Sequence, residues 1–128
     1  MSELTPYIAV DDAPRAIDWY VEHLGAVVTY EPIVMPDGRI GHVELEIDGA
    51  RWMMSDAHPE LNVEAPLPGR GAAITLHLTV PDVDALAERA SNGGALLDRG
   101  PEDGGIGRIA VIRDPFGHRW FLNQPADG

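Results

Sequence analysis

The feature that most restricts the fold of this chain is an internal repeat. Residues 51–54 read Arg-Trp-Met-Met, and residues 119–122 read Arg-Trp-Phe-Leu. Each tetrapeptide closely follows a glycine, Gly49 in the first case and Gly117 in the second, where a turn is expected. Self-similarity at a fixed interval indicates two copies of one structural unit, so the chain is expected to consist of two similar halves.

Other landmarks recur at nearly the same interval. Val10 and Val80 are 70 positions apart, whereas Gly25 and Gly94 are 69 positions apart. The small drift is what short deletions in the loops of one half produce. The two halves therefore keep the same order of elements along their whole length.

The first half predicts a strand, a helix and three more strands. Asp11 and Asp12 offer a helix cap, Pro14 suits a first helical turn, and Gly25 suits the position after a helix. Alternating apolar residues, or runs of β-branched and aromatic residues, predict strands at residues 5–10, 27–30, 40–47 and 51–55. The helix is expected to end at Leu24.

The second half predicts the same order. The expected strands are residues 73–80, 95–97, 108–112 and 119–123, the helix follows a cap at Asp82, and residues 101–105 form a loop. Prolines and glycines without periodicity mark residues 57–71 as a linker. The sequence thus predicts a single α+β domain over residues 1–128, with tandem βαβββ modules at 1–56 and 72–125.

Composition limits the classes of partner. The formal net charge of −12 disfavours nucleic acid, which needs a basic surface, and would attract a cationic ligand; the alternative is that acidity serves solubility alone. The chain has no cysteine, and its hydrophobic fraction of 45% is that of a globular protein. Because no apolar run or secretory signal stands out, we expect a cytoplasmic protein that is not in a membrane.

Three segments carry a resemblance to a known family. They are residues 7–12 (YIAVDD) followed by 16–20 (AIDWY), residues 78–84 (LTVPDVD), and residues 114–120 (DPFGHRW). In this order the chain resembles the vicinal oxygen chelate superfamily, which comprises glyoxalases, bleomycin resistance proteins and extradiol dioxygenases. The resemblance implies paired modules that form a cupped, mixed β-sheet around a cleft, with the helices outside, and a homodimer.

The resemblance also implies four positions for a divalent metal. The enzymes of the superfamily place His, Gln or Glu on four strands, and the matching positions here hold Thr5, Met53, Thr75 and Phe121. None of these is a usual ligand of such an ion, so no metal cofactor is expected. The alternative is one divalent metal at a displaced site made by His42, Glu44 and His77.

Strand alternation separates the residues expected to face the cleft from those expected to face the helices. The cleft-facing residues, which are mostly polar or aromatic, are Thr5, Tyr7, His42, Glu44, Glu46, Arg51, Met53, Thr75, His77, Arg108, Arg119 and Phe121. Trp52, Met54, Trp120 and Leu122 are expected to point to the helices. All of the cleft-facing residues except Thr5 and Thr75 are candidate ligand contacts.

Among these residues His77 is the best catalytic candidate, as a general acid or base. The alternative is a histidine satisfied by Thr75, Thr79 or a carboxylate. His23, His58 and His118 lie near expected turns or helix ends, so they are predicted to be surface residues.

The other candidates also leave alternatives open. Glu44 and Glu46 can face a cationic ligand or pair with an arginine such as Arg51 or Arg119. Tyr7, Met53 and Phe121 can stack on a planar ligand or fill the cavity floor.

Two functions follow from the sequence. The first is a metal-free binding protein of this superfamily that sequesters a small organic ligand, which is cationic or aromatic. The resemblance implies this role, because the bleomycin resistance members confer antibiotic resistance by sequestering a ligand. The second is a metal-dependent lyase, isomerase or dioxygenase of the same superfamily. A third reading is a regulatory module whose cleft is filled by its own side chains.

Overall fold

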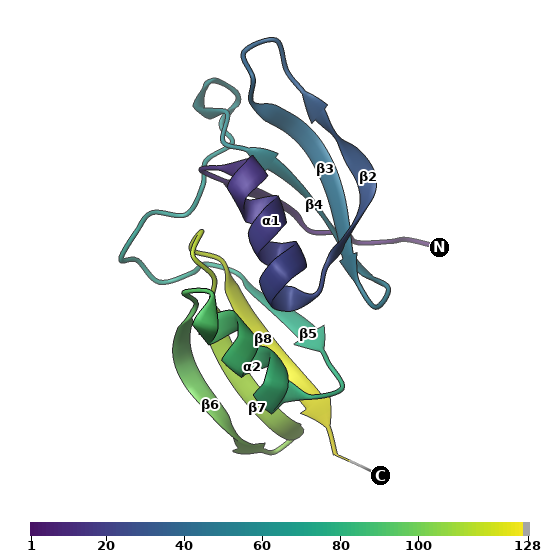
Figure 1. Cartoon of the computed structure of the whole chain (residues 1–128), viewed down its shortest axis with the longest axis vertical. Helices are drawn as coiled ribbons and strands as arrows, with labels where there is room; N and C mark the ends of the chain where they lie inside the picture. The colour runs from purple at the N-terminus through teal and green to yellow at the C-terminus, as the bar shows by residue number, and fades with distance from the viewer. Residues whose placement is uncertain (127–128) are drawn as a thin grey trace. The chain divides into compact units, whose positions relative to one another are not determined.

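The chain consists of two compact units, which divide between Pro66 and Leu67 (Figure 1). The structure, a computed structural model, describes residues 1–126. Each unit has its own sheet of four strands and its own helix, so the predicted α+β fold with tandem βαβββ modules is confirmed.

The first unit contains all the elements from β1 to a short 3-10 helix. They are β1 (Tyr7–Val10), α1 (Ala13–Leu24), β2 (Val27–Val34), β3 (Ile40–Ile47), β4 (Ala50–Asp56) and η1 (Pro59–Leu61). The strand order in the sheet is β1-β4-β3-β2. β1 and β4 run parallel, whereas the β4–β3 and β3–β2 pairs are antiparallel.

The second unit repeats this topology. Its elements are β5 (Thr75–Thr79), α2 (Val83–Asn92), β6 (Leu96–Gly104), β7 (Gly107–Arg113) and β8 (Arg119–Pro125). The strand order is β5-β8-β7-β6, again with one parallel pair, β5–β8. The registers also match, since Tyr7 pairs with Met53 in the first unit and His77 with Phe121 in the second.

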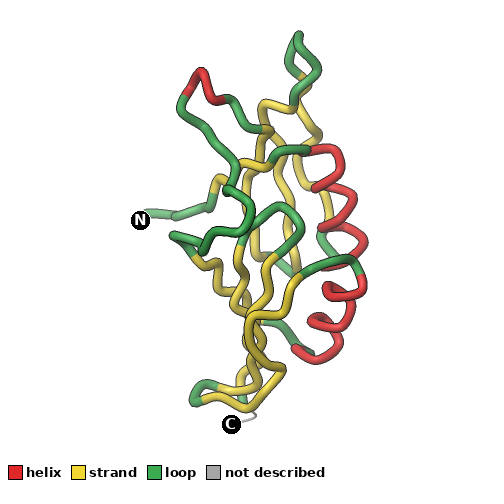
Figure 2. Tube along the Cα trace, turned by 90° about the vertical axis from the view of Figure 1, so that its left-hand side faces the viewer, coloured by secondary structure: helices red, strands yellow, loops and turns green. Residues whose placement is uncertain are grey.

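In each unit the helix covers one face of the sheet (Figure 2). Asp12 caps α1 by accepting a hydrogen bond from the Arg15 amide, and Gly25 ends it in the left-handed conformation with φ 72°. The predicted inward direction of the tryptophans and their neighbours is confirmed: Trp52 packs edge-on against Tyr20 of α1, and Trp120 is equally buried.

Both helices are short. α1 has 12 residues and α2 has 10. Within residues 1–126 no helix has the length and apolar character needed to cross a lipid bilayer.

Two segments differ from the sequence-based expectation. The loop expected at residues 101–105 is largely strand, because β6 continues to Gly104 and pairs Glu102 with Ile109 and Asp103 with Arg108. Register shifts between Leu97 and Glu102 interrupt the alternation that would have revealed this strand. Residues 57–66, expected as part of a linker, belong to the first unit.

Candidate functional site

The face of the first sheet that α1 does not cover carries aromatic and acidic side chains. Strand pairing brings them together, since Met53 of β4 pairs with Tyr7 and Glu44, and Tyr30 of β2 pairs with Glu44. The Tyr7 and Tyr30 side chains are about half exposed. This face matches the expected direction of Tyr7, His42, Glu44 and Met53.

A chain of hydrogen bonds runs across this face from Tyr7 to Glu44. The Tyr7 hydroxyl oxygen lies 2.9 Å from the Gly41 carbonyl oxygen and 2.9 Å from Nδ1 of His42. Nε2 of His42 lies 2.9 Å from a carboxylate oxygen of Glu44. Because a carboxylate only accepts, Nε2 carries a proton and donates a hydrogen bond to Glu44.

The electrostatic environment of Tyr7 is negative. Burial and, to a smaller extent, the charge of Glu44 raise the pKa of the Tyr7 hydroxyl above its ordinary value. The hydroxyl therefore stays protonated at neutral pH and donates its hydrogen bond within the chain, to the Gly41 carbonyl. Tyr30 adds a second aromatic ring, packed edge-on against His42 with 5.6 Å between the ring centres.

A pocket of about 610 Å³ lies beside this hydrogen-bonded chain, wholly within the first unit. Its walls are mainly apolar and come from the strands β1 to β4, the turn after β2 and the segment after β4. The lining residues are Tyr7, Ile33, Met35, Gly41, His42, Ser55, His58, Leu61 and Val63. This volume is in the range of small-molecule sites.

His58, which lines this pocket, is not the surface residue that the sequence predicted. Its side chain is only 7% exposed, and Nδ1 lies 2.8 Å from the carbonyl oxygen of Asp56. The backbone of His58 also bonds to Val63 in both directions, which closes the loop around η1. The sequence of this segment has the irregular pattern of a linker, and nothing in that pattern marks His58 as a site residue.

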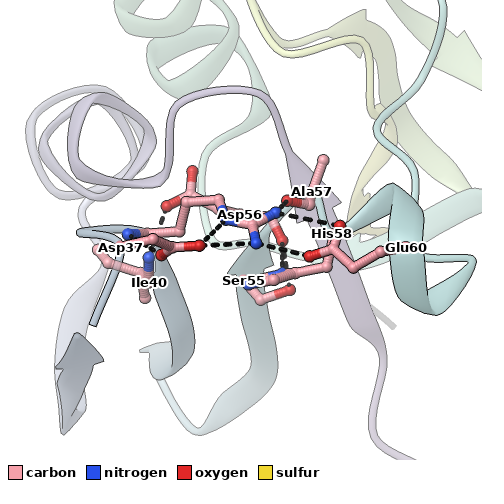
Figure 3. A network of polar contacts seen from close by, with 8 residues as sticks. Asp37, Ile40, Ser55, Asp56, Ala57, His58 and Glu60 are labelled. Carbon is pink, nitrogen blue, oxygen red and sulfur yellow. Dashed lines mark hydrogen bonds and ion pairs between the residues drawn. The ribbon is translucent and has the colours of Figure 1, made fainter. Parts of the chain in front are cut away.

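The buried carboxylate of Asp56 fixes the start of this loop. Its two oxygens each accept a backbone hydrogen bond of 2.7 Å, from Ala13 at the start of α1 and from Ile40 at the start of β3. Figure 3 shows Asp56 between Ile40 and the residues that lead to His58. Asp56 thereby holds the helix, the sheet and the pocket wall in one arrangement.

Arg39 ties the outer side of the loop to the turn before β3. Its guanidinium donates to the Ala57 carbonyl at 3.1 Å, to Asp37 at 2.8 Å and to Glu60 of η1 at 2.5 Å. These hydrogen bonds lower the pKa values of the Asp37 and Glu60 carboxyls.

This arrangement predicts a pH-dependent effect of Arg39→Met. Carboxyls whose pKa is lowered by folding stabilise the native state above their unfolded pKa of about 4, and the stabilisation is lost as the pH falls through the lowered values. The variant should therefore be less stable than the wild type at pH 7, and the difference should shrink at pH 3. Urea unfolding at both pH values measures it; an equal deficit at pH 7 and pH 3 would contradict the ion-pair account.

Arg70→Met is the matched control for that experiment. Arg70 is exposed, and within residues 1–126 it contributes a backbone carbonyl that accepts from Arg113 and no side-chain ion pair. Its replacement should shift the urea midpoint little at either pH.

The remaining predicted site residues lie elsewhere. Arg51 pairs with Glu3 at 2.6 Å and not with Glu44 or Glu46. In the second unit His77 stacks on Phe121, with ring centres 5.4 Å apart, and is exposed. Whether they contact a ligand stays a prediction.

Arg119 and Arg108 differ in the face they occupy. Arg119 donates to Thr75 at 2.9 Å and pairs with Asp98. Arg108 was expected on the face away from the helix, and this expectation is wrong: it forms two hydrogen bonds with Asp84 of α2. It belongs to the helix-facing side of β7.

The sequence profile of the Glyoxalase/Bleomycin resistance protein/Dioxygenase superfamily matches residues 4–122. This range includes both units and nearly all of the described chain. The protein belongs to this superfamily.

Similar proteins come from several bacteria. An uncharacterized Mycobacterium bovis protein, Mb0911c, is 42% identical over 95% of this chain and 82% of its own length. The crystal structure of TioX from Micromonospora sp. ML1 has 26% identity and a TM-score of 0.71, covering 99% of this chain and 98% of that one. TnmS3, described as an antibiotic binding protein from Streptomyces sp. CB03234, has 28% identity and a TM-score of 0.69, covering 98% of each chain.

The residues at the four positions that the resemblance assigns to a metal are poor ligands for a divalent ion. Phe121 has no donor atom, and Met53 offers only a soft thioether. The Thr75 hydroxyl already accepts a hydrogen bond from the Arg119 guanidinium, whose charge would repel a cation. Among residues 1–126 no three His, Asp or Glu side chains come together as a metal-binding group.

Proposed function

We propose that this protein binds a small planar aromatic molecule, without a metal, in the pocket of the first unit. The observation that carries the proposal is the pocket itself: about 610 Å³, with apolar walls and a few polar groups that converge on it. Sites of this composition suit small organic molecules, because apolar walls supply affinity and fixed polar groups supply orientation.

The aromatic residues support a flat ligand. Tyr7 and His42 lie with their ring centres 5.3 Å apart beside the pocket, and Tyr7 is half exposed. A planar molecule can contact such rings over a large area, and each aromatic contact adds about 0.5–1.5 kcal/mol beyond area burial. The flexible thioether of Met35 adapts to an aromatic surface.

The charge distribution supports a preference for a cationic ligand. Residues 1–66 carry thirteen Asp and Glu but only three Arg, so this unit holds −10 of the net charge of −12. Glu46 forms no ion pair among the described residues, and Glu44 has a histidine as its partner. A positive group near these carboxylates would be attracted, and salt should weaken the attraction.

A set of naphthalene derivatives tests this proposal. The probes are 1-naphthylmethylammonium, 2-naphthol and 2-naphthalenesulfonate, which share one ring system and differ in charge. We expect fluorescence titrations to show binding in the order cation, neutral, anion. Met35→Asp, which puts a charge into the apolar wall, should weaken the binding of 2-naphthol by about tenfold or more.

Val21→Asp is the matched control. Val21 is 41% exposed on α1, and Met35 is 40% exposed, so the two changes differ mainly in position. The control should bind all three probes as the wild type does. The proposal fails if none of the probes binds, or if Met35→Asp and Val21→Asp behave alike.

The competing function is a metal-dependent lyase, isomerase or dioxygenase of the same superfamily. Metal analysis of protein purified without a histidine tag separates the two functions. One tightly bound Zn, Ni, Fe or Mn per chain, released by His77→Ala, would overturn the metal-free proposal.

A further inference from the structure

We propose that His58 accepts a hydrogen bond from a hydroxyl group of the ligand, so that the pocket selects hydroxylated aromatic molecules such as phenols. This inference rests on the proposed function, because it concerns the same pocket. It names an acceptor atom, Nε2 of His58, and a chemical class, an aromatic compound with an O–H donor.

The tautomer of His58 follows from its one hydrogen bond within the chain. A backbone carbonyl only accepts, so the nitrogen 2.8 Å from the Asp56 oxygen, Nδ1, carries the proton. In the neutral form of the ring, this leaves Nε2 unprotonated and a hydrogen-bond acceptor. Among residues 1–126, the bond from Nδ1 is the only hydrogen bond that the His58 side chain makes.

The other polar groups near His58 are already engaged. The Ser55 hydroxyl donates to the Asp56 carbonyl at 2.9 Å, and the Tyr7 hydroxyl lies within 2.9 Å of two acceptors. Neither hydroxyl group forms a hydrogen bond with Nε2 of His58. The acceptor is thus left for a molecule in the pocket that it lines.

The His58 ring is fixed before any ligand arrives. It is 7% exposed, and its backbone lies in the closed loop between His58 and Val63. Figure 3 shows His58 next to Ala57 in the same network that contains Asp56. A fixed acceptor in an apolar pocket discriminates well, because a ligand without a donor leaves it desolvated and unpaired.

The test compares 2-naphthol, whose oxygen carries a hydrogen, with 2-methoxynaphthalene, whose oxygen carries a methyl group and cannot donate. In the wild type, 2-naphthol should bind about three- to tenfold more tightly, the range expected for one neutral hydrogen bond. His58→Asn removes Nε2 but keeps an amide N–H that can reach the Asp56 carbonyl. In this variant the ratio of the two dissociation constants should fall to about one.

Two controls distinguish the possible outcomes. His23→Asn, at the end of α1, should keep the wild-type ratio, and circular dichroism should show that His58→Asn is folded. A wild-type ratio near one, or an unchanged ratio in His58→Asn, overturns the His58 inference while binding in the pocket stands. Loss of binding for all naphthalene probes in the wild type overturns the proposed function, and the inference with it.

Discussion

Replacing Asp56 by alanine should lower the free energy of unfolding by about 3 kcal/mol, since hydrogen bonds to a charged group contribute about 1.5–3 kcal/mol each. The carboxylate is 7% exposed and accepts two backbone hydrogen bonds, from Ala13 and Ile40. Without it, both amides are buried without a partner. The negative charge next to the start of α1 is lost as well, and such a charge stabilises a helix N-terminus.

Urea unfolding followed by circular dichroism measures this effect. Asp12→Ala is the graded control, because Asp12 accepts one exposed hydrogen bond, and a lost N-cap costs about 1 kcal/mol. Asp56→Asn should fall between the wild type and Asp56→Ala, since its amide oxygen can replace one carboxylate oxygen but its NH2 group cannot accept from the other backbone amide. Equal losses for Asp56→Ala and Asp12→Ala would contradict the role given to Asp56.

Asp114→Ala should destabilise the second unit by a similar amount, about 3 kcal/mol. This carboxylate, 4% exposed, accepts from the amides of Phe116 and His118 and, at 2.9 Å, from the indole nitrogen of Trp120. It therefore fixes both the turn before β8 and the orientation of the tryptophan behind it. Removing it leaves a buried indole N–H without this acceptor.

A double-mutant cycle isolates the contact between Asp114 and Trp120. Trp120→Phe removes the indole N–H but keeps an aromatic ring in the core. In that background Asp114→Ala should cost about 1 kcal/mol less than in the wild type, measured by urea unfolding. Strictly additive losses would show that the indole bond contributes nothing and that the turn amides account for the whole effect.

The repeat and the strand patterns predicted most of the fold. The glycines at 49 and 117, followed by the same Arg-Trp pair, locate the turn before the last strand of each unit, and the structure has β4 and β8 there. Clean alternation in residues 40–47 placed Val43, Leu45 and Ile47 on one face, and all three are buried. Local patterns were sufficient wherever one face of a strand is buried and the other is not.

Arg108 was placed on the wrong face because β7 does not alternate. Residues 109–112 are all buried, so the pattern of apolar side chains does not reveal which face belongs to the helix. Register decides it: Ala110 pairs with Leu122 and Ile112 with Trp120, so Arg108 lies on the same side as these core residues.

His58 was missed for a different reason. Its burial depends on contacts that are distant in sequence or irregular, namely the Arg39 ion pairs across the loop and the bridge to Val63. Pro59 within the loop, and the prolines and glycines at 66–71, give the segment the pattern of a linker. The sequence also did not predict that Ile33 lines the pocket. β2 continues beyond Tyr30 through register shifts that break its alternation.

The most direct test of metal-free binding in the first unit is calorimetric titration of 2-naphthol into the untagged protein before and after EDTA treatment. We predict one molecule bound per chain, with the same dissociation constant in both samples, and a dissociation constant at least about tenfold higher for Met35→Asp. Binding that disappears after EDTA treatment and returns on addition of Zn²⁺ or Mn²⁺ would contradict this account.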